Sequence, residues 1–497
     1  MHEVDDDLHE RDSTSARYFV MPGFPPLMHP MTKYKAILER SAYATIFDEL
    51  MSKVKLCFDR NRDANMVLTG NPGIGKSRFY LYCMFRLARD DGVDAQKLDP
   101  FDLVLNCGRD FQKYLPESKE FVELDDADVN SLMSKPRVLR LIEGDSSKLN
   151  GWSGVSILFA SRNLKGMNNY AKVNSYTYIM PEWTLDELQD CNSILSDDLK
   201  LSDELLISRF NKFGGVPRRI FTTTEMEAEQ KLATAIESFT AEDVISYAWC
   251  NRRPIDRMHD HSSILKMTPF SKDFRATSHT DFQSDYIAEK VIDKMDDKSL
   301  RKLSKIETAA FRGTIYRMLC HQWVTQQQKL QFRSLGTEAP LELILGNMKD
   351  RGVPTSSGGV VLSRDMEIRQ FSTLSGIHAA QIGRTYFRPA SPAFKPLDAF
   401  ILDTNKSECY GLVTTLHSDH EIEAEPLDQF IKWLQRVGVP ADRFSLCFIT
   451  PSDLEKQFKM QTVRTDTGQV LQSLESLVSV KQFVAAFDAF ISPTHSS

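Results

Sequence analysis

Residues 70–77 read GNPGIGKS and match the pattern GxxxxGK[ST] at every position. A short apolar run at 65–69 precedes them, and the helical pattern RFYLYCMFRLARD follows. A strand, a glycine-rich loop and a helix in this order form a phosphate-binding loop, in which backbone N–H groups and the positive end of the helix surround phosphate oxygens. The expected binding residues are Gly70, Asn71, Pro72, Gly73, Ile74, Gly75, Lys76 and Ser77.

The two polar residues that end this loop carry its expected chemistry. The ammonium group of Lys76 is placed to reach the β and γ phosphates, and the hydroxyl group of Ser77 is placed to bind Mg²⁺. ATP with Mg²⁺ is therefore the expected cofactor. The alternative is a glycine turn with a coincidental GKS, which the flanking strand and helix disfavour.

A phosphate loop also needs an acidic residue at the tip of a neighbouring strand. The apolar segment from Arg137 to Ile142 ends in two carboxylates, Glu143 and Asp145. Glu143 stands where an Asp is more usual, and either carboxylate can contact the water shell of Mg²⁺ or polarise the attacking water. The alternative is a solvated turn after a strand.

Two further segments are candidates for sensing the γ-phosphate. The strand at 155–160 leads into Ser-Arg-Asn at 161–163, which a capped loop explains equally well. The segment from Gly214 to Arg218 reads GGVPR, in which the glycines allow close backbone approach and the proline fixes the turn. We expect Arg218 to reach the phosphates as a sensor; the alternative is a simple turn after a helix.

Composition limits what the rest of the chain can be. The 497 residues are 41% apolar and 26% charged, which excludes collagenous, coiled-coil and wholly disordered chains. The net charge of −7 argues against a uniformly basic nucleic-acid-binding surface. The eight cysteines lack CxxC and zinc-finger spacing, so we expect reduced, mostly buried thiols. With no secretory signal and no apolar run of about 20 residues, an intracellular, soluble protein without membrane contact is expected.

Apolar patterning predicts an α/β chain with several parts. Strand candidates at 102–105, 138–142 and 155–160 alternate with helical stretches, which is typical of a parallel sheet with crossover helices. In the second half, the pattern predicts a helix and then strands at 305–328, 397–402, 410–416 and 444–450. The expected parts are a flexible lead-in at 1–33, a P-loop core at 34–180 that opens with a helix at 34–56, a helical lid at 181–250, a connector at 251–299 and a second α/β domain at 300–497.

Four segments together resemble one protein family. They read GNPGIGKSRFYLYCMFRLA, SILFASR, YIMPEWTLDEL and GGVPRRIF, in this order. The set is similar to the nucleotide-binding module of Crinkler effectors and the related retrotransposon hot spot proteins, over about residues 34–225. The resemblance implies an AAA-type ATPase domain in which Lys76, Ser77, Glu143 or Asp145, and Arg218 serve ATP binding or hydrolysis. It also implies a secreted virulence effector that acts in a nucleus, including that of a host cell.

From about 300 to 490 the chain resembles the C-terminal domain of this family, which is similar to nucleases of the restriction-endonuclease, or PD-(D/E)xK, fold. Asp398 matches the metal-binding Asp of that fold. Arg312 replaces the acid of the first helix, and the family's Gln-x-Thr, a variant of Glu-x-Lys, aligns with residues 413–415, Val-Thr-Thr. Since one ligand of three does not make a metal site, we expect a degenerate nuclease with a vestigial site. Asp403 and Glu408 are candidate substitutes with unsuitable spacing.

The sequence thus predicts an ATP-binding and ATP-hydrolysing protein whose nucleotide state controls a DNA-facing, nuclease-like domain. Two alternatives stay open: an active metal-dependent endonuclease, and a nucleotide-locked interaction protein that binds DNA or a host nuclear protein without turnover. A homo-oligomer is also open. Double-stranded DNA is a candidate partner because four cations share one helix face, although a solvated face beside two aspartates explains them as well. These cations are Lys298, Arg301, Lys302 and Lys305.

Overall fold

The computed structural model divides the chain into two compact units, Met1–Gln283 and Ser284–Ser497. The boundary between the units falls inside the predicted connector at 251–299. Of the predicted lead-in at 1–33, the structure describes only Tyr18–Val20. The structure describes residues 18–20, 36–88, 97–98, 100–146, 148–160, 170, 176–221, 225–243, 245, 262–270, 274–275, 278–303, 309–327, 329–345, 366–377, 383–390, 394, 396–464 and 480–488.

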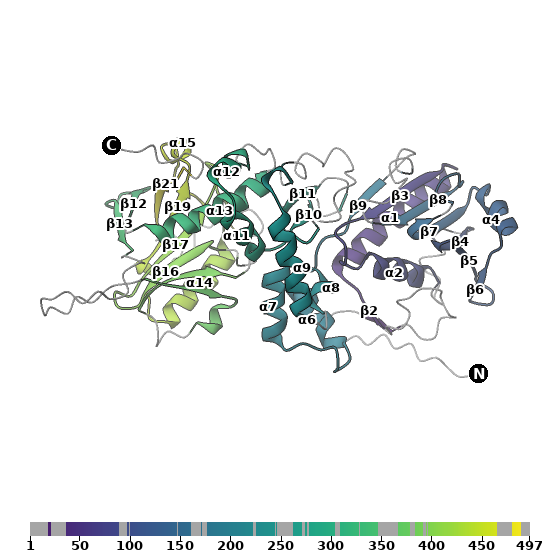
Figure 1. Cartoon of the computed structure of the whole chain (residues 1–497), viewed down its shortest axis with the longest axis horizontal. Helices are drawn as coiled ribbons and strands as arrows, with labels where there is room; N and C mark the ends of the chain where they lie inside the picture. The colour runs from purple at the N-terminus through teal and green to yellow at the C-terminus, as the bar shows by residue number, and fades with distance from the viewer. Residues whose placement is uncertain are drawn as a thin grey trace, which may run out of the picture. The chain divides into compact units, whose positions relative to one another are not determined.

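A seven-stranded sheet forms the centre of the first unit, in the order β6-β5-β4-β7-β8-β3-β9 (Figure 1). The five strands from β4 to β9 in this order are parallel, as the sequence predicts, and β5 and β6 extend one edge as antiparallel strands. The strands are β3 (Ala64–Thr69), β4 (Asp102–Gly108), β5 (Asp110–Leu115), β6 (Glu120–Glu123), β7 (Val138–Ser146), β8 (Val155–Phe159) and β9 (Tyr176–Ile179).

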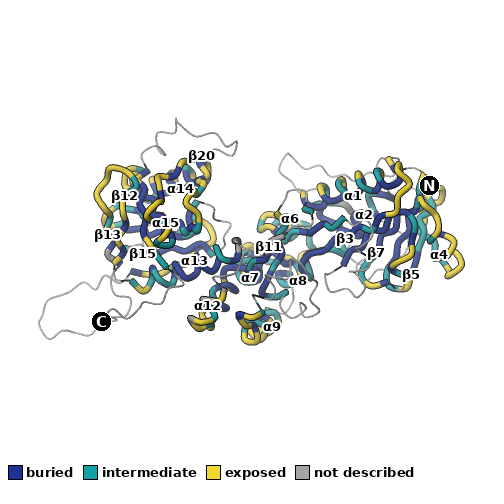
Figure 2. Tube along the Cα trace, turned by 90° about the horizontal axis from the view of Figure 1, so that it is seen from above, coloured by how far each residue is buried: buried dark blue, intermediate teal, exposed yellow. Residues whose placement is uncertain are grey.

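Helices cover the faces of this sheet because its central strands are apolar on both sides. All five residues of β8 are buried, and Figure 2 shows β3 and β7 in the colour of buried residues. Helices α1 (Ser41–Asp59) and α2 (Lys76–Ala88) join the largest apolar core, together with side chains from β3, β4, β7 and β8. The helix α4 (Asp126–Met133) begins at Asp125, whose carboxylate accepts hydrogen bonds from two backbone N–H groups.

The expected helix at 34–56 is wrong at its beginning. Residues Ala36–Leu38 form β2, which pairs in antiparallel fashion with β1 (Tyr18–Val20), and α1 starts only at Ser41. Arg40, with φ −76° and ψ 148°, has the extended backbone of a residue before a helix. A single apolar side chain such as Ile37 fits either period, so the pattern could not separate this strand from the helix.

Four more helices and a hairpin are among the described residues of the first unit. Helix α6 begins with a capping box, in which the Thr184 hydroxyl and the Glu187 carboxylate each accept a hydrogen bond from the other residue's backbone N–H. The far end of the hairpin is tied to the sheet, because Ile179 N donates to the carbonyl oxygen of Phe274 (2.7 Å). The elements are α6 (Leu185–Ile194), α7 (Asp203–Phe213), α8 (Pro217–Ile220), α9 (Glu225–Ser238), β10 (Leu265–Pro269) and β11 (Ser278–Phe282).

The second unit contains an eight-stranded mixed sheet in the order β13-β12-β21-β19-β17-β16-β15-β14. Strands β15, β16 and β17 form an antiparallel meander, while β17, β19 and β21 are parallel. The predicted strands β16, β17 and β19 are confirmed. The strands are β12 (Lys329–Ser334), β13 (Leu341–Ile344), β14 (Glu367–Phe371), β15 (Arg384–Pro389), β16 (Ala399–Asp403), β17 (Glu408–Thr414), β19 (Phe444–Thr450) and β21 (Lys481–Ala486).

Helices α13 and α14 pack against this sheet in separate apolar cores. The predicted helix at 305–328 is described from Ala309 onward. Strands β18 (Ile422–Glu423) and β20 (Val463–Arg464) pair in parallel and form a separate two-stranded sheet. The helices are α11 (Asp285–Asp293), α12 (Asp297–Leu303), α13 (Ala309–Gln326), α14 (Ala424–Arg436) and α15 (Ser452–Glu455).

Two further features of the described residues concern membrane-spanning helices and cysteines. Among the described residues, no helix has the length and apolar character needed to cross a lipid bilayer. Seven of the eight cysteines are described; these are unpaired thiols, of which five are buried and Cys107 and Cys191 are partly exposed. Cys250 lies outside the described residues.

Two neighbouring glycines allow a matched test of packing around β8. Gly154 (φ +82°) and Gly151 (φ +88°) share a left-handed backbone, but a Cβ at Gly154 would lie 2.5 Å from the carbonyl oxygen of Val138. At Gly151 the nearest atom, the Met133 Cε, would be 3.5 Å away. Gly151→Ala should lower the free energy of unfolding by about 1 kcal/mol, from backbone strain alone.

Gly154→Ala should lower it by roughly 3 kcal/mol, because the added methyl group also overlaps backbone atoms. Chemical denaturation followed by circular dichroism measures both values. Equal losses in the two variants would contradict the described approach of β7 to Gly154.

Candidate functional site

The glycine-rich loop lies between the end of β3 and the start of α2, as its sequence predicts. Gly73 has φ +86°, and a Cβ there would lie 2.9 Å from the Cβ of Arg218 and 3.2 Å from the Cγ1 of Val216. Only glycine suits both this backbone conformation and this close approach. Arg218 therefore lies beside the loop, and its side chain is exposed to solvent.

The side chain of Lys76 folds back onto the loop that precedes it. Its Nζ donates hydrogen bonds to the carbonyl oxygens of Gly70 (3.0 Å) and Asn71 (2.9 Å). Burial lowers the pKa of Lys76 to about 8; the negative charge of Glu143 raises it, and the positive charge of Arg218 lowers it. The loop thus places two cationic groups close together, an arrangement suited to a polyanion.

Glu143 lies near the end of β7 and contacts the first turn of α2. Ser77 Oγ donates a hydrogen bond of 2.5 Å to Glu143 Oε1. Glu143 Oε2 is buried and has no hydrogen-bond partner among the described residues. Burial raises the pKa of Glu143 to about 7, against the hydrogen bond from Ser77 and the charge of Lys76, which lower it.

The strand that carries Glu143 is not the direct neighbour of β3. Strand β8 lies between β3 and β7, so the expectation of an acid on the adjacent strand is wrong by one strand. The contact with Ser77 still forms because α2 packs against both β7 and β8. Strand order depends on how distant segments pair, and no local pattern in the sequence specifies it.

The donor set fits Mg²⁺ bound together with a triphosphate. The Ser77 hydroxyl and the Glu143 carboxylate are oxygen ligands of the kind that Mg²⁺ prefers, and Glu143 Oε2 is a buried acceptor without a partner. Across the described residues, no group of three or more His, Cys, Asp or Glu side chains is arranged to hold a metal by itself. Magnesium sites in such loops draw their remaining ligands from water and phosphate.

The other predicted acid has a different environment. Asp145 is exposed, and its Oδ1 accepts a hydrogen bond from the backbone N–H of the next residue, Ser146 (2.9 Å). Of the two predicted carboxylates, only Glu143 is described in contact with the phosphate loop. The sensor candidates at 161–163 lie outside the described residues.

Two aromatic side chains donate hydrogen bonds to the loop backbone, and neither contact was predicted from the sequence. Trp183 Nε1 donates to the carbonyl oxygen of Ile74 (2.7 Å), and the Tyr43 hydroxyl donates to that of Gly75 (3.1 Å). The guanidinium group of Arg40 lies 4.7 Å from the centre of the Trp183 ring. Arg40 also donates to the backbone carbonyl oxygens of Pro181 and Glu182.

The carboxylate of Asp398, the expected vestigial metal ligand, is in contact with Thr414 and Arg317. Its Oδ2 accepts hydrogen bonds from Thr414 N (2.6 Å) and Thr414 Oγ1 (2.8 Å). Arg317 Nε lies 4.0 Å from Asp398 Oδ1, and the same guanidinium group forms a two-pronged pair with Asp285. Val413, at the aligned ligand position, is 5% exposed and packs in the apolar core.

The proposed substitute ligands Asp403 and Glu408 lie too far along the sheet. Asp398 precedes the first residue of β16, Asp403 ends that strand, and Glu408 pairs with Asp403. Five residues of extended strand separate Asp398 from Asp403 by about 16 Å. Neither substitute can therefore share a metal ion with Asp398.

The cationic helix face is described only in part. Lys298 and Lys302 are exposed on α12, which has seven residues. Nothing is described of the Arg301 side chain, and Lys305 lies outside the described residues. The DNA-binding face remains a prediction.

Comparisons with known proteins add little to this geometry. No family model matches the sequence, and no curated protein matches it. Among solved structures, the chain is similar to the ORC2 protein of Aeropyrum pernix, determined in ADPNP and ADP complexes. The two chains are 12% identical, the alignment covers 62% of this chain and 78% of the other, and the TM-score is 0.22. A likeness of this strength carries no conclusion about fold or function.

The raised pKa of Glu143 predicts a pH-dependent effect of removing its charge. The pKa of Glu143 is about 7 in the folded chain and near the ordinary value of 4.5 in the unfolded chain. Loss of the Glu143 proton therefore favours the unfolded chain. Folded stability therefore falls as the pH rises through this window. In the absence of ligand, Glu143→Gln should stabilise the protein by about 3 kcal/mol near pH 7.5 and by much less near pH 5.

Unfolding by denaturant at the two pH values measures this difference. Glu204→Gln, at an exposed glutamate in the first turn of α7, is the matched control and should show no such pH dependence. If Glu143→Gln raised the free energy of unfolding equally at both pH values, the raised pKa of Glu143 would be contradicted.

Proposed function

We propose that this protein binds ATP in the loop 70–77 and hydrolyses it, as an AAA-type P-loop ATPase. The observation that carries the proposal is the pair formed by Ser77 and Glu143, in which one carboxylate oxygen accepts from the Ser77 hydroxyl and the other is buried without a partner. Lys76 and Arg218 beside this pair supply the positive charge that a triphosphate needs.

Each side chain has a distinct part in this proposal. Lys76 exchanges its two carbonyl acceptors in the loop for phosphate oxygens, which are stronger, charged acceptors. Ser77 and Glu143 are the residues that would hold Mg²⁺, and a bound Mg²⁺ would neutralise charge on the phosphates. Glu143 is also the candidate base for the attacking water, because its Oε2 has no hydrogen-bond partner among the described residues. Arg218 contacts the phosphates from the side of Gly73.

For the second unit, we propose a nuclease-like domain that faces DNA and does not cut it. Thr414 already donates two hydrogen bonds to Asp398 Oδ2, and the Arg317 guanidinium group lies 4.0 Å from Oδ1. Nuclease chemistry of this type needs several carboxylates on one metal ion. In the proposed effector, which acts in a nucleus, nucleotide state in the first unit controls how the second unit engages DNA or a host nuclear protein.

Loss of the Lys76 charge should abolish ATP turnover. Lys76→Ala removes the only ammonium group described on the loop, so ATP affinity should fall by at least about tenfold and hydrolysis should be undetectable. Binding of a fluorescent ATP analogue and release of inorganic phosphate measure the two effects. Lys55→Ala, at a lysine that is 53% exposed on α1, is the matched control and should keep both activities.

Two further variants identify which carboxylate, that of Glu143 or that of Asp145, acts in hydrolysis. Glu143→Gln should preserve ATP binding and lose hydrolysis, because an amide cannot accept the proton. Asp145→Asn should keep both. Normal hydrolysis by Lys76→Ala would end the P-loop proposal, and loss of turnover in Asp145→Asn alone would move the catalytic role to Asp145.

The second unit should not cut DNA. With one carboxylate already paired to Thr414, a bound Mg²⁺ or Mn²⁺ lacks the ligands that would position it against a phosphate. The full chain should leave supercoiled plasmid intact in either metal, with and without ATP. Nicking that disappears in Asp398→Ala would restore the active-endonuclease alternative.

A further inference from the structure

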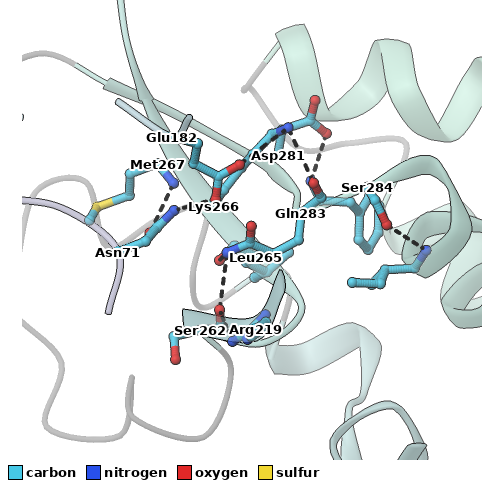
Figure 3. Close-up of polar contacts among 12 residues, drawn as sticks. Asn71, Glu182, Arg219, Ser262, Leu265, Lys266, Met267, Asp281, Gln283 and Ser284 are labelled. Carbon is cyan, nitrogen blue, oxygen red and sulfur yellow. Dashed lines mark hydrogen bonds and ion pairs between the residues drawn. The ribbon is translucent and has the colours of Figure 1, made fainter. Parts of the chain in front are cut away.

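Asn71 connects the phosphate loop to elements beyond it. Its side chain is buried, with 2% of the residue exposed. The Asn71 Nδ2 donates to Glu182 Oε1 (2.9 Å), and Asn71 Oδ1 accepts from the backbone N–H of Met267 on β10 (3.3 Å). One loop side chain thus bonds both the segment after β9 and the β10–β11 hairpin, as Figure 3 shows.

Glu182 is the shared partner in this network. Its Oε2 lies 3.9 Å from Lys266 Nζ, and its side chain is 12% exposed. Burial raises the pKa of Glu182, while Lys266, Asn71, Arg219 and Gln283 lower it. Asn71 of the phosphate loop and Lys266 of β10 therefore meet at one carboxylate, the first at Oε1 and the second at Oε2 (Figure 3).

The hairpin ends where the second unit begins. Gln283 follows β11 and donates from Nε2 to the carbonyl oxygens of Ser262 (3.1 Å) and Leu265 (3.2 Å). The next residue, Ser284, belongs to the second unit, and its hydroxyl accepts from the backbone N–H of Ile287 at the start of α11. The hairpin and α11 are thus consecutive in the chain, joined at Gln283 and Ser284.

The loop contacts make Asn71 sensitive to what the loop holds. Lys76 Nζ bonds the backbone carbonyl oxygen of Asn71, and a phosphate group competes for that ammonium group. Pro72 follows Asn71 and restricts its backbone to extended conformations. A shift of the Asn71 carbonyl group therefore moves its side chain with it, and the bonds to Glu182 and Met267 change together.

We propose that Glu182 is a positioning residue that, through Asn71, couples nucleotide binding by the phosphate loop to the order of the β10–β11 hairpin. This inference rests on the proposed ATP binding. Its essential contact is the hydrogen bond between Asn71 and Glu182, and the hairpin is the element that responds. The pair of Glu182 with Lys266 stabilises the network without transmitting the change.

Amide hydrogen exchange of the full chain, with and without saturating ATP and Mg²⁺, tests the coupling. In the wild-type protein, ATP should change exchange in residues 265–282 by about fivefold, the effect of gaining or losing one hydrogen bond. Glu182→Ala, at a residue outside the phosphate loop, should bind ATP and lose this response. Glu182→Gln keeps an oxygen that accepts from Asn71 and should retain it, and Glu204→Ala is the control.

The outcomes separate this inference from the proposed function. Bound ATP without a hairpin response in the wild-type protein, or a full response in Glu182→Ala, overturns the coupling and leaves ATP binding intact. Loss of the response in Glu182→Gln shows that the ion pair with Lys266 transmits the change, which also overturns it. If a fluorescent ATP analogue does not bind the wild-type protein, both proposals fail.

Discussion

The half-buried ammonium group of Lys76 is the charge around which the phosphate loop is arranged. Burying an ionised group is costly unless hydrogen bonds and opposite charge replace the lost water. Two loop carbonyl groups and the nearby Glu143 do so, but they lower rather than remove the cost, since the pKa of Lys76 stays depressed. The same cost leaves the group ready to exchange weak neutral acceptors for charged phosphate oxygens.

Local sequence patterns predicted the parts of this site that are contiguous in the chain. The strand, loop and helix around 70–77 follow from adjacent residues, and so does the apolar strand that ends in Glu143. The contacts of Trp183, Tyr43 and Glu182 with the loop could not be predicted, because they join segments more than 30 residues apart. Strand order was missed for the same reason, and β2 was assigned to a helix because three residues are too few to show a period.

In the second unit the predicted strands appeared, and the chemistry around Asp398 depends on partners that the sequence did not identify. Arg317 stands between Asp285 and Asp398, and Thr414 bonds the Asp398 carboxylate from β17. A cation that is hydrogen-bonded to Asp285 and lies 4.0 Å from Asp398 compensates the charge of both carboxylates, as a metal ion otherwise does for clustered carboxylates. Such compensation preserves a fold around acidic residues without requiring that they react.

Trp183 has a consequence for how this protein can be observed. Its indole N–H is bonded to the loop backbone, and the Arg40 guanidinium group lies over its ring. Indole emission depends on the electric field and hydrogen bonding at the ring, and both change if the loop backbone moves. One of the five tryptophans therefore lies a single hydrogen bond away from the phosphate loop, so a movement of the loop backbone changes the light emission of the unlabelled protein.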